Sequence, residues 1–231
     1  MSDFDLSILI NLSISELLDI AKAKSKGDHD SLSKSIYLGS FTLNSKLPYK
    51  TTLMREVLCH RFNDFANAAV ELYELNRIVP AFVLTRAVME DTAIMYSLFT
   101  RTSEFVKTKN DDLFDQFLMK GIFGSRNELT PLQSNNILTA IDHIDKKFNG
   151  TRNMYDMLCE FTHPNYAGAM GSYCSVDEEK HITYFGKEHV SLPVENGLIP
   201  LIICFDLFTD YYNSLAGQIK IMNDCYEQKS K

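Results

Sequence analysis

The sequence predicts an all-α protein, an up-and-down helical bundle with one small β-hairpin inserted before its last helix. Two observations support this fold. Between residues 51 and 101, apolar side chains recur at steps of three and four, as they do on the buried face of a helix. Between residues 172 and 185, apolar residues flank the polar turn 177–180, a pattern typical of a β-hairpin. The 231 residues are 45% hydrophobic, which is enough for one domain with a sizeable core.

The N-terminal segment, residues 1–50, is expected to hold one helix and a stretch that covers the core. Ser13 and Glu16 fit a capping box, so the helix should begin at Ser13 and end near Lys26. Its last turn is rich in lysine, which the helix dipole favours. Residues 31–47 fit either a helix or an extended segment wrapped around the core.

The bundle core is expected over residues 51–171. Five of its segments have helical patterns, and these are 51–77, 79–101, 111–121, 130–148 and 151–163. The second is apolar nearly all round, which predicts a central helix that is buried on most sides. Thr130 and Pro131 are typical of the cap and first position of a helix, so the fourth segment should begin there.

The C-terminal part is expected to contain the hairpin, over residues 172–190, and a final core helix, over residues 196–226, with Asn196 as its cap. The most apolar stretch, 198–208, is shorter than the roughly 20 residues needed to span a bilayer, so we expect an interior helix and no membrane contact. All segments together are expected to form one helical domain, residues 1–231.

Composition restricts the compartment and the partners. The formal net charge is −7, which argues against binding of duplex DNA. The number of cysteines is odd and no two form a C-x-x-C pair, so we expect buried, reduced thiols in a cytoplasmic protein. These cysteines are Cys59, Cys159, Cys174, Cys204 and Cys225. Residues 1–5 lack the positive region of a signal peptide.

Arg86 and Glu90 interrupt the apolar central helix. Their spacing of four places them on one helix face, within reach of each other. One interpretation is an anchored guanidinium that binds a phosphate or carboxylate, with Glu90 as the group that orients it. The alternative is an ion pair that satisfies itself inside the bundle and fixes helix register.

A second polar group closes the helix 151–163, because Pro164 disfavours helical backbone at the residue before it. Tyr155, His163 and Asn165 could form a catalytic or binding site there, with His163 as general base and Tyr155 beside it. The alternative is that His163 and Asn165 only satisfy backbone groups at the helix end.

Arg55 and His60 form a runner-up pair on the helix 51–77. A cation and an imidazole about one turn apart could activate a ribose hydroxyl and stabilise phosphorane-like charge in RNA cleavage. The alternative is a solvated or interfacial helix face.

Metal and cofactor sites have little support. Asp142, His143 and Asp145 share a helix but lack a closed ligand set. No Gly-rich phosphate loop, nucleophile elbow or H-E-x-x-H motif occurs. We therefore expect no metal and no cofactor.

A buried helix with Arg-x3-Glu, followed much later by Tyr-x7-His-Pro-Asn and a glycine, resembles a group of uncharacterised bacterial helical proteins. The residues that carry the resemblance are Arg86, Glu90, Tyr155, His163, Pro164, Asn165 and Gly168. That group is similar to the HEPN superfamily, whose name refers to nucleotide binding in higher eukaryotes and prokaryotes. The resemblance covers residues 51–171 and the last helix.

The resemblance implies an up-and-down helical bundle that is often dimeric. Many members of the superfamily are ribonucleases in toxin–antitoxin and antiphage systems, and others are non-catalytic. The nuclease pattern has its arginine four to six residues before the histidine on a late core helix, whereas the helix ending at His163 has its arginine at Arg152. Arg55 and His60 have that spacing but lie on an early helix.

The leading hypothesis is therefore a non-catalytic binding or regulatory module, in a defence or toxin–antitoxin context. Its polar crevice would hold a small anion, a nucleotide or a nucleic-acid end such as RNA, and the protein would act as a homodimer. The first alternative is a metal-independent endoribonuclease that uses Arg/His acid–base chemistry. The second is a structural interaction or scaffold protein whose polar groups only specify packing.

Overall fold

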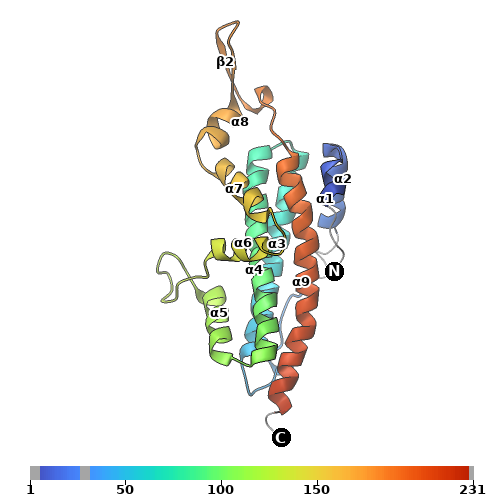
Figure 1. Ribbon diagram of the computed structural model, residues 1–231, viewed down its shortest axis with the longest axis vertical. Coiled ribbons are helices and arrows are strands. Elements are labelled where there is room, and N and C mark those ends of the chain that lie inside the picture. The colour runs from blue at the N-terminus through green and yellow to red at the C-terminus, as the bar shows by residue number, and fades with distance from the viewer. Residues whose placement is uncertain (1–5, 27–31, 229–231) are drawn as a thin grey trace.

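The computed structural model describes residues 6–26 and 32–228. Three long helices run lengthwise through the molecule, and they are α3 (Leu47–Glu74), α4 (Ile78–Thr108) and α9 (Glu195–Gln228). The short α1 (Leu6–Ile10) and α2 (Ile14–Ser25) lie beside them (Figure 1). This arrangement confirms the predicted all-α bundle with a small hairpin before its last helix.

Helix α4 is the centre of the bundle, as its all-round apolar sequence predicts. It packs against α3 and α9 along its length and against α6 and α7 on its remaining side. Its buried side chains include Phe82, Val88, Met95 and Leu98, none of which is exposed. The polar groups of α4 that face the bundle are therefore surrounded by protein, and their hydrogen-bond partners determine their chemistry.

The capping box predicted at Ser13 is present. The Ser13 side chain accepts a hydrogen bond from the backbone N–H of Glu16, and the Glu16 carboxylate accepts one from the backbone N–H of Ser13 at 2.8 Å. The following segment is mostly irregular. In its described residues, the one helical turn is η2 (Leu38–Ser40), and the Thr42 backbone N–H donates to Asn223 of α9 at 2.8 Å. Residues 27–31 lie outside the described residues.

The boundaries of α3 and α4 differ from the prediction. Helix α3 begins at Leu47, with Pro48 in its first turn, and ends at Glu74, three residues before the expected end. Helix α4 continues past the expected residue 101 to Thr108 and is closed by Lys109 in a left-handed conformation. Helix α5 (Asp111–Phe123) begins where predicted and is two residues longer.

The helix predicted over residues 130–148 is wrong over its first seven residues. Helix α6 spans only Ile137–Asp145, and its cap is Asn136, whose Oδ1 accepts from the Leu138 N–H at 2.9 Å. Thr130 does not cap a helix, because its hydroxyl donates to the Phe123 carbonyl. Residues 124–136 instead form a loop that extends away from the bundle between α5 and α6 (Figure 1).

Helix α7 (Thr151–Thr162) ends where Pro164 requires, with His163 in an extended backbone conformation. A π-helical turn, η3 (Tyr166–Met170), and α8 (Gly171–Tyr173) lead into the hairpin. Strands β1 (Cys174–Asp177) and β2 (Ile182–Phe185) pair antiparallel, and η4 (Lys187–His189) leads on toward α9.

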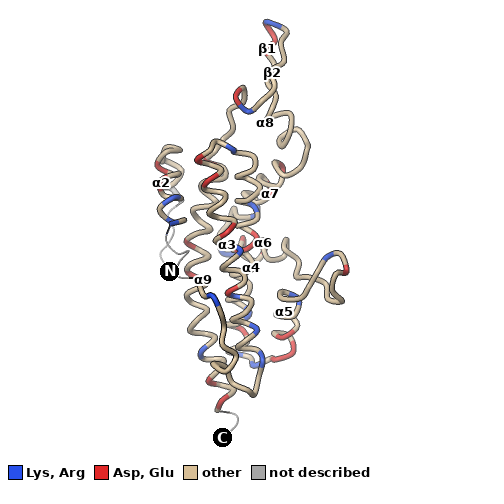
Figure 2. The backbone as a smooth tube through the Cα atoms, turned by 180° about the vertical axis from the view of Figure 1, so that it is seen from behind, with Lys and Arg blue, Asp and Glu red and all other residues tan. Residues whose placement is uncertain are grey.

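The hairpin projects beyond one end of the bundle (Figure 1). Asn196 lies inside α9, so the predicted cap is wrong: the helix begins at Glu195. Acidic and basic residues are interspersed along the helices, so neither sign of charge dominates the backbone view of Figure 2. Within the described ranges, no helix is both long and apolar enough to cross a membrane.

All five cysteines are free thiols. Cys59 and Cys204 are buried, whereas Cys159, Cys174 and Cys225 are partly exposed. The expectation of free thiols is confirmed, and the expectation of burial holds for two of the five.

Candidate functional site

Helices α4 and α7 bring four polar side chains together in the bundle. Arg86 and Glu90 lie one turn apart on α4, and Tyr155 and Cys159 lie one turn apart on α7. Both pairs have the four-residue spacing that places side chains on one helix face. Because α4 and α7 pack against each other, the two faces meet, and we call the four residues the polar tetrad.

The tetrad is a closed set of hydrogen bonds around the Arg86 guanidinium. Its Nη2 donates to the Tyr155 hydroxyl at 2.9 Å and lies 3.0 Å from Glu90 Oε1. Its Nε donates to Cys159 Sγ at 3.1 Å. The Tyr155 hydroxyl in turn donates to Glu90 Oε1 at 2.9 Å. Within the described residues, no partner contacts Nη1, so its two N–H groups remain open.

Burial and the neighbouring charges fix the protonation states of this set. Burial, reinforced by Glu90, raises the pKa of the Tyr155 hydroxyl to about 12, although the Arg86 hydrogen bond acts in the opposite direction. Burial works against the Arg86 cation, yet the Tyr155 hydrogen bond and the Glu90 charge raise the pKa of the guanidinium above its ordinary value. Tyr155 is therefore a neutral donor at physiological pH, which suits it to orienting Glu90 and Arg86.

His163 and Asn165 lie apart from the tetrad. His163 is eight residues beyond Tyr155, which corresponds to about 12 Å along a helix axis at 1.5 Å per residue. It is exposed. Asn165 Nδ2 donates to Glu160 at 2.7 Å, and Asn165 Oδ1 accepts from the Gly168 N–H at 3.0 Å. Asn165 thus caps the π-helical turn and does not reach the tetrad.

Gly168 explains why the chain keeps this shape after α7. A Cβ atom at this position would lie 2.0 Å from the His163 carbonyl oxygen, a separation that no side chain tolerates. The glycine predicted to accompany the His-Pro-Asn segment therefore serves close backbone packing. The crevice predicted from Arg86, Glu90, Tyr155, His163 and Asn165 contains the first three of these residues only.

A cleft of about 640 Å³ lies beside the tetrad, between α4, α6, α7 and the loop 124–136. Three arginines line it, Arg86 from α4, Arg126 from the loop and Arg152 from α7, together with amide side chains of the loop such as Asn135 and Asn136. We call this the arginine cleft. The donors that face it suit an anion with several acceptor oxygens.

The three arginines differ in how far their charge is already neutralised. Arg152 is held by Asp156 at 2.8 Å and by Asp142 at 2.6 Å, and these hydrogen bonds raise its pKa. Arg86 is held by Glu90. Arg126 is exposed and forms no ion pair with any other described residue. The cationic character of the cleft therefore rests on Arg126 and on the open Nη1 of Arg86.

Sequence reasoning missed Arg126. It follows Gly124 and Ser125 in a segment without helical periodicity, so no spacing places its side chain on a helix face. The available signal was a run of turn-forming and polar residues between two amphipathic helices, which is where binding residues often lie.

The runner-up pair is not brought together. Arg55 Nε donates to the Tyr212 carbonyl at 3.0 Å, its Nη1 lies 2.6 Å from Glu56, and its guanidinium stacks on the Tyr212 ring at 3.6 Å. His60 is exposed, and its Nε2 contacts the Ser33 carbonyl at 2.8 Å. Five residues of α-helix rotate the two side chains by about 140°. Arg55 and His60 therefore lie on different faces of α3 and do not form a pair.

The side chains considered as metal ligands, Asp142, His143 and Asp145, have other partners. Asp142 pairs with Arg152, and Asp145 Oδ1 accepts from the Gly150 and Arg152 backbone N–H groups at 3.0 Å each. The His143 ring packs against the Tyr96 ring, with 4.9 Å between their centroids. No group of three or more metal-ligating side chains is found in the part of the chain that the structure describes.

Comparisons with known proteins give no match: no family model fits the chain, and no curated protein or solved structure is significantly similar to it. The HEPN resemblance therefore stays a prediction. What the protein does has to be argued from the arrangement of its own residues.

Proposed function

We propose that the protein is a non-catalytic binding module that holds the phosphate of a nucleotide or of an RNA end in the arginine cleft. The observation that carries this proposal is the state of Arg86. Its Nε and Nη2 are fixed by protein partners, while Nη1 stays open, within the described residues, on a guanidinium that lines the cleft. A pre-oriented donor of this kind binds an anion with little loss of side-chain entropy.

Arg126 supplies the second half of the proposed site. It lines the same cleft from a loop, and its charge is not neutralised by another described residue. A phosphate between Arg126 and Arg86 would accept charge-assisted hydrogen bonds from both. Nearby, Asn135 Nδ2 donates to the Phe117 carbonyl and Asn136 Oδ1 caps α6. The other amide atoms, Asn135 Oδ1 and Asn136 Nδ2, could hydrogen-bond a ribose or a base edge.

The resemblance to HEPN proteins agrees with a nucleotide or RNA ligand, and it extends the proposal to a homodimeric regulator in a defence or toxin–antitoxin setting. The ribonuclease alternative has less support. Tyr155 is neutral and committed to Glu90, and His163 lies about two helical turns beyond Tyr155.

The proposal is tested by calorimetric titration at low ionic strength with a short RNA carrying a 5′-phosphate and with the same RNA lacking it. We expect binding to require the phosphate. Arg126→Gln should weaken it by at least about tenfold, the value of one charge-assisted hydrogen bond. Arg101→Gln is the matched control, because Arg101 is an exposed arginine of α4 whose partner is Glu104.

Equal binding of the two RNAs, or equal losses in the two arginine variants, would contradict the phosphate site. The ribonuclease alternative needs a separate assay, in which mixed RNA is incubated without metal with wild type and with the His163→Ala and His60→Ala variants. Cleavage that is lost in one variant would replace the binding proposal with a nuclease. Absence of any RNA or nucleotide binding would support the scaffold alternative.

A further inference from the structure

The hairpin is a sheet of two strands that extends beyond the bundle. β1 and β2 pair antiparallel, and the arm that they form projects from one end of the molecule (Figure 1). A two-stranded sheet is marginally stable in water, and an open strand edge is a template for pairing with another chain. The hairpin is therefore the part of the fold best suited to strand pairing with a partner.

The outer edge of β2 presents unpaired backbone groups at Thr183 and Phe185. The Gly186 N–H donates to the Tyr173 carbonyl at 2.8 Å, so these two residues form a hydrogen-bonded pair of the ladder. Bonded and non-bonded pairs alternate along an antiparallel ladder, so Tyr184 is bonded to β1 and its two neighbours are not. Thr183 and Phe185 therefore direct their N–H and C=O groups away from β1.

The two edges of the hairpin differ in what lies beside them. The turns η3 and η4 pack against β1, whereas β2 packs chiefly against β1 itself. On one face, the Tyr184 ring packs against the His189 ring of η4, with 5.0 Å between their centroids. The opposite face carries Val176 and Phe185, which are 63% and 76% exposed. The edge of β2 is thus the open one, and an exposed apolar face adjoins it.

β2 can pair with itself about a two-fold axis. Two antiparallel copies of a strand are related by such an axis only where a residue lies opposite itself. With Tyr184 on the axis, Thr183 of each copy lies opposite Phe185 of the other, and both residues have outward N–H and C=O groups. The same pairing sets each Phe185 ring beside a Thr183 side chain, which covers part of the exposed apolar face.

The charges of the hairpin favour this register. The turn 178–181 carries two carboxylates, Glu178 and Glu179, and one lysine that already pairs with a carboxylate of β1. With Tyr184 on the axis, the turn falls beside residues 187–190 of the second copy. There Lys187 and Arg77 line a groove of about 530 Å³, in whose described lining no residue is acidic. The two cations outnumber the one carboxylate nearby in sequence, that of Glu188.

We propose that β2 pairs antiparallel with β2 of a second copy of this chain, so that two hairpins form one four-stranded sheet. The carboxylates of each turn then lie near the cations at the base of the other hairpin. This inference gives a surface to the homodimer that belongs to the proposed function. It does not depend on the anion site, because no residue of the hairpin lines the arginine cleft.

The first test is sedimentation of the full chain, without RNA, over a range of micromolar concentrations. Thr183→Pro removes an N–H that β1 does not use, so the hairpin keeps its own ladder. We expect the dissociation constant of the dimer to rise at least about tenfold, because one hydrogen bond is lost from each copy. Val176→Pro is the matched control: Val176 lies opposite Thr183, and its N–H faces outward on the edge of β1. This variant should dimerise as wild type does.

The second test exchanges charges and needs no proline. Lys187→Glu alone, and Glu178→Lys with Glu179→Lys, should each weaken the dimer, since like charges then face each other across the two copies. The protein that carries all three substitutions should dimerise more tightly than either. Lack of recovery would contradict the antiparallel arrangement.

A monomeric wild type, a dimer that survives Thr183→Pro, or equal losses in the two proline variants would overturn the proposal. Binding of the 5′-phosphorylated RNA by Thr183→Pro should equal that of wild type. Loss of the dimer and loss of the phosphate site are therefore separate results, and either proposal can fail while the other stands.

Discussion

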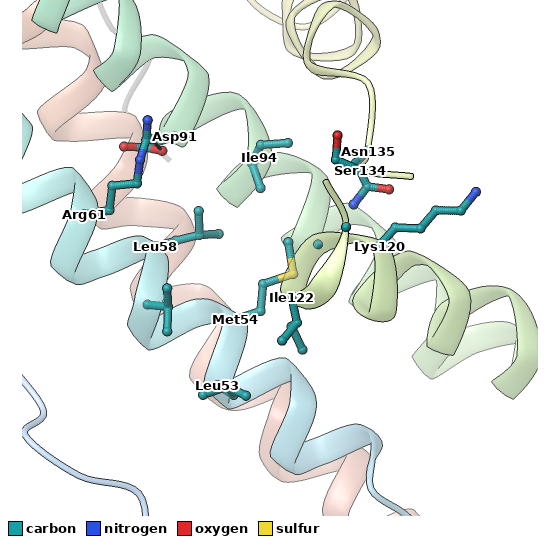
Figure 3. A pocket seen from close by; sticks show the side chains of 13 residues that line it. Leu53, Met54, Leu58, Arg61, Asp91, Ile94, Lys120, Ile122, Ser134 and Asn135 are labelled. Atoms are coloured by element: carbon teal, nitrogen blue, oxygen red, sulfur yellow. Dashed lines mark hydrogen bonds and ion pairs between the residues drawn. The ribbon is translucent and has the colours of Figure 1, made fainter. Parts of the chain in front are cut away.

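The arginine cleft and a mostly aliphatic cavity of about 330 Å³ between α3, α4 and α5 (Figure 3) lie on two sides of one short segment, because Ser134 and Asn135 line both. They contain opposite kinds of incomplete hydrogen bonding. In the cleft, Arg86 has donors to spare, and its side chain is 31% exposed. On the lining of the cavity, the buried Oδ2 of Asp91 has no hydrogen-bond partner among the described residues, and the side chain, which pairs with Arg61 through Oδ1, is 3% exposed.

The difference shows how burial changes the free-energy cost of a charged side chain at two positions of one helix. Arg86 and Asp91 are five residues apart on α4, yet the cleft leaves water near the first and the bundle removes it from the second. A partly hydrated guanidinium keeps its charge at a small desolvation cost and remains available to bind an anion. A dehydrated carboxylate is destabilised, and protonation relieves the cost of burying its charge.

The largest expected effect comes from Asp91→Asn, measured as the free energy of unfolding against pH. The folded-state pKa of about 7 lies above the ordinary value of 3.8, so the folded protein binds a proton that the unfolded chain releases. Stability should therefore fall as pH rises from about 4 to about 7. The variant, which cannot ionise, should gain up to roughly 4 kcal/mol over wild type above pH 7.

Near pH 4 both proteins carry a neutral side chain at this position, and their stabilities should converge. Urea denaturation at several pH values separates these regimes. A constant difference between Asp91→Asn and wild type from pH 4 to pH 8 would mean that Arg61 keeps Asp91 ionised, and the contrast with Arg86 would disappear.

A smaller effect is expected from Tyr155→Phe in the tetrad. The variant removes the hydroxyl that Arg86 and Glu90 share while leaving their ion pair, so it should cost about 1–2 kcal/mol of unfolding free energy. Because Arg86 is then less firmly held, anion binding in the cleft should also weaken. Thermal unfolding and phosphate titration measure the two effects.

Tyr212→Phe is the matched control for Tyr155→Phe. The Tyr212 hydroxyl donates to Glu56 at 2.9 Å, and Arg55 lies over its ring, so the same chemistry recurs between α3 and α9. We expect a similar loss of stability without a change in anion affinity. If both tyrosine variants bind phosphate as wild type does, the tetrad serves packing alone and the scaffold alternative is favoured.

Most of the fold could be predicted because it follows from local patterns. Periodic apolar residues predicted α3, α4 and α9, and the capping box at Ser13 is local chemistry that needs no tertiary contact. The start of α6 could not be predicted in this way. Thr130-Pro131 has the residue types of a helix start, but the Thr130 hydroxyl reaches the Phe123 carbonyl across the loop, and Asn136 is the real cap.

The residues of the candidate site also fall into those that local patterns predict and those that depend on tertiary contacts. Arg86, Glu90 and Tyr155 were predicted because polar residues on helices can be placed by their phase. Arg126 lies on an aperiodic loop, and the significance of Asp91 depends on its burial in the bundle and on its pairing with Arg61 of α3. Sequence spacing gives no information about which acidic residue of a helix will lose its water.

The smallest effect is expected from His163→Ala, which asks whether the helix end at Pro164 belongs to the cleft. His163 is exposed and lies about 12 Å along α7 from Tyr155, so the substitution should change stability by less than about 0.5 kcal/mol. Phosphate affinity should also stay unchanged, in contrast to Arg126→Gln. A loss of binding as large as that of Arg126→Gln would extend the cleft to the helix end and restore the crevice that the sequence predicts. Unchanged binding would confine the site to α4, α7 and the loop, where Arg86 and Arg126 line the same cleft.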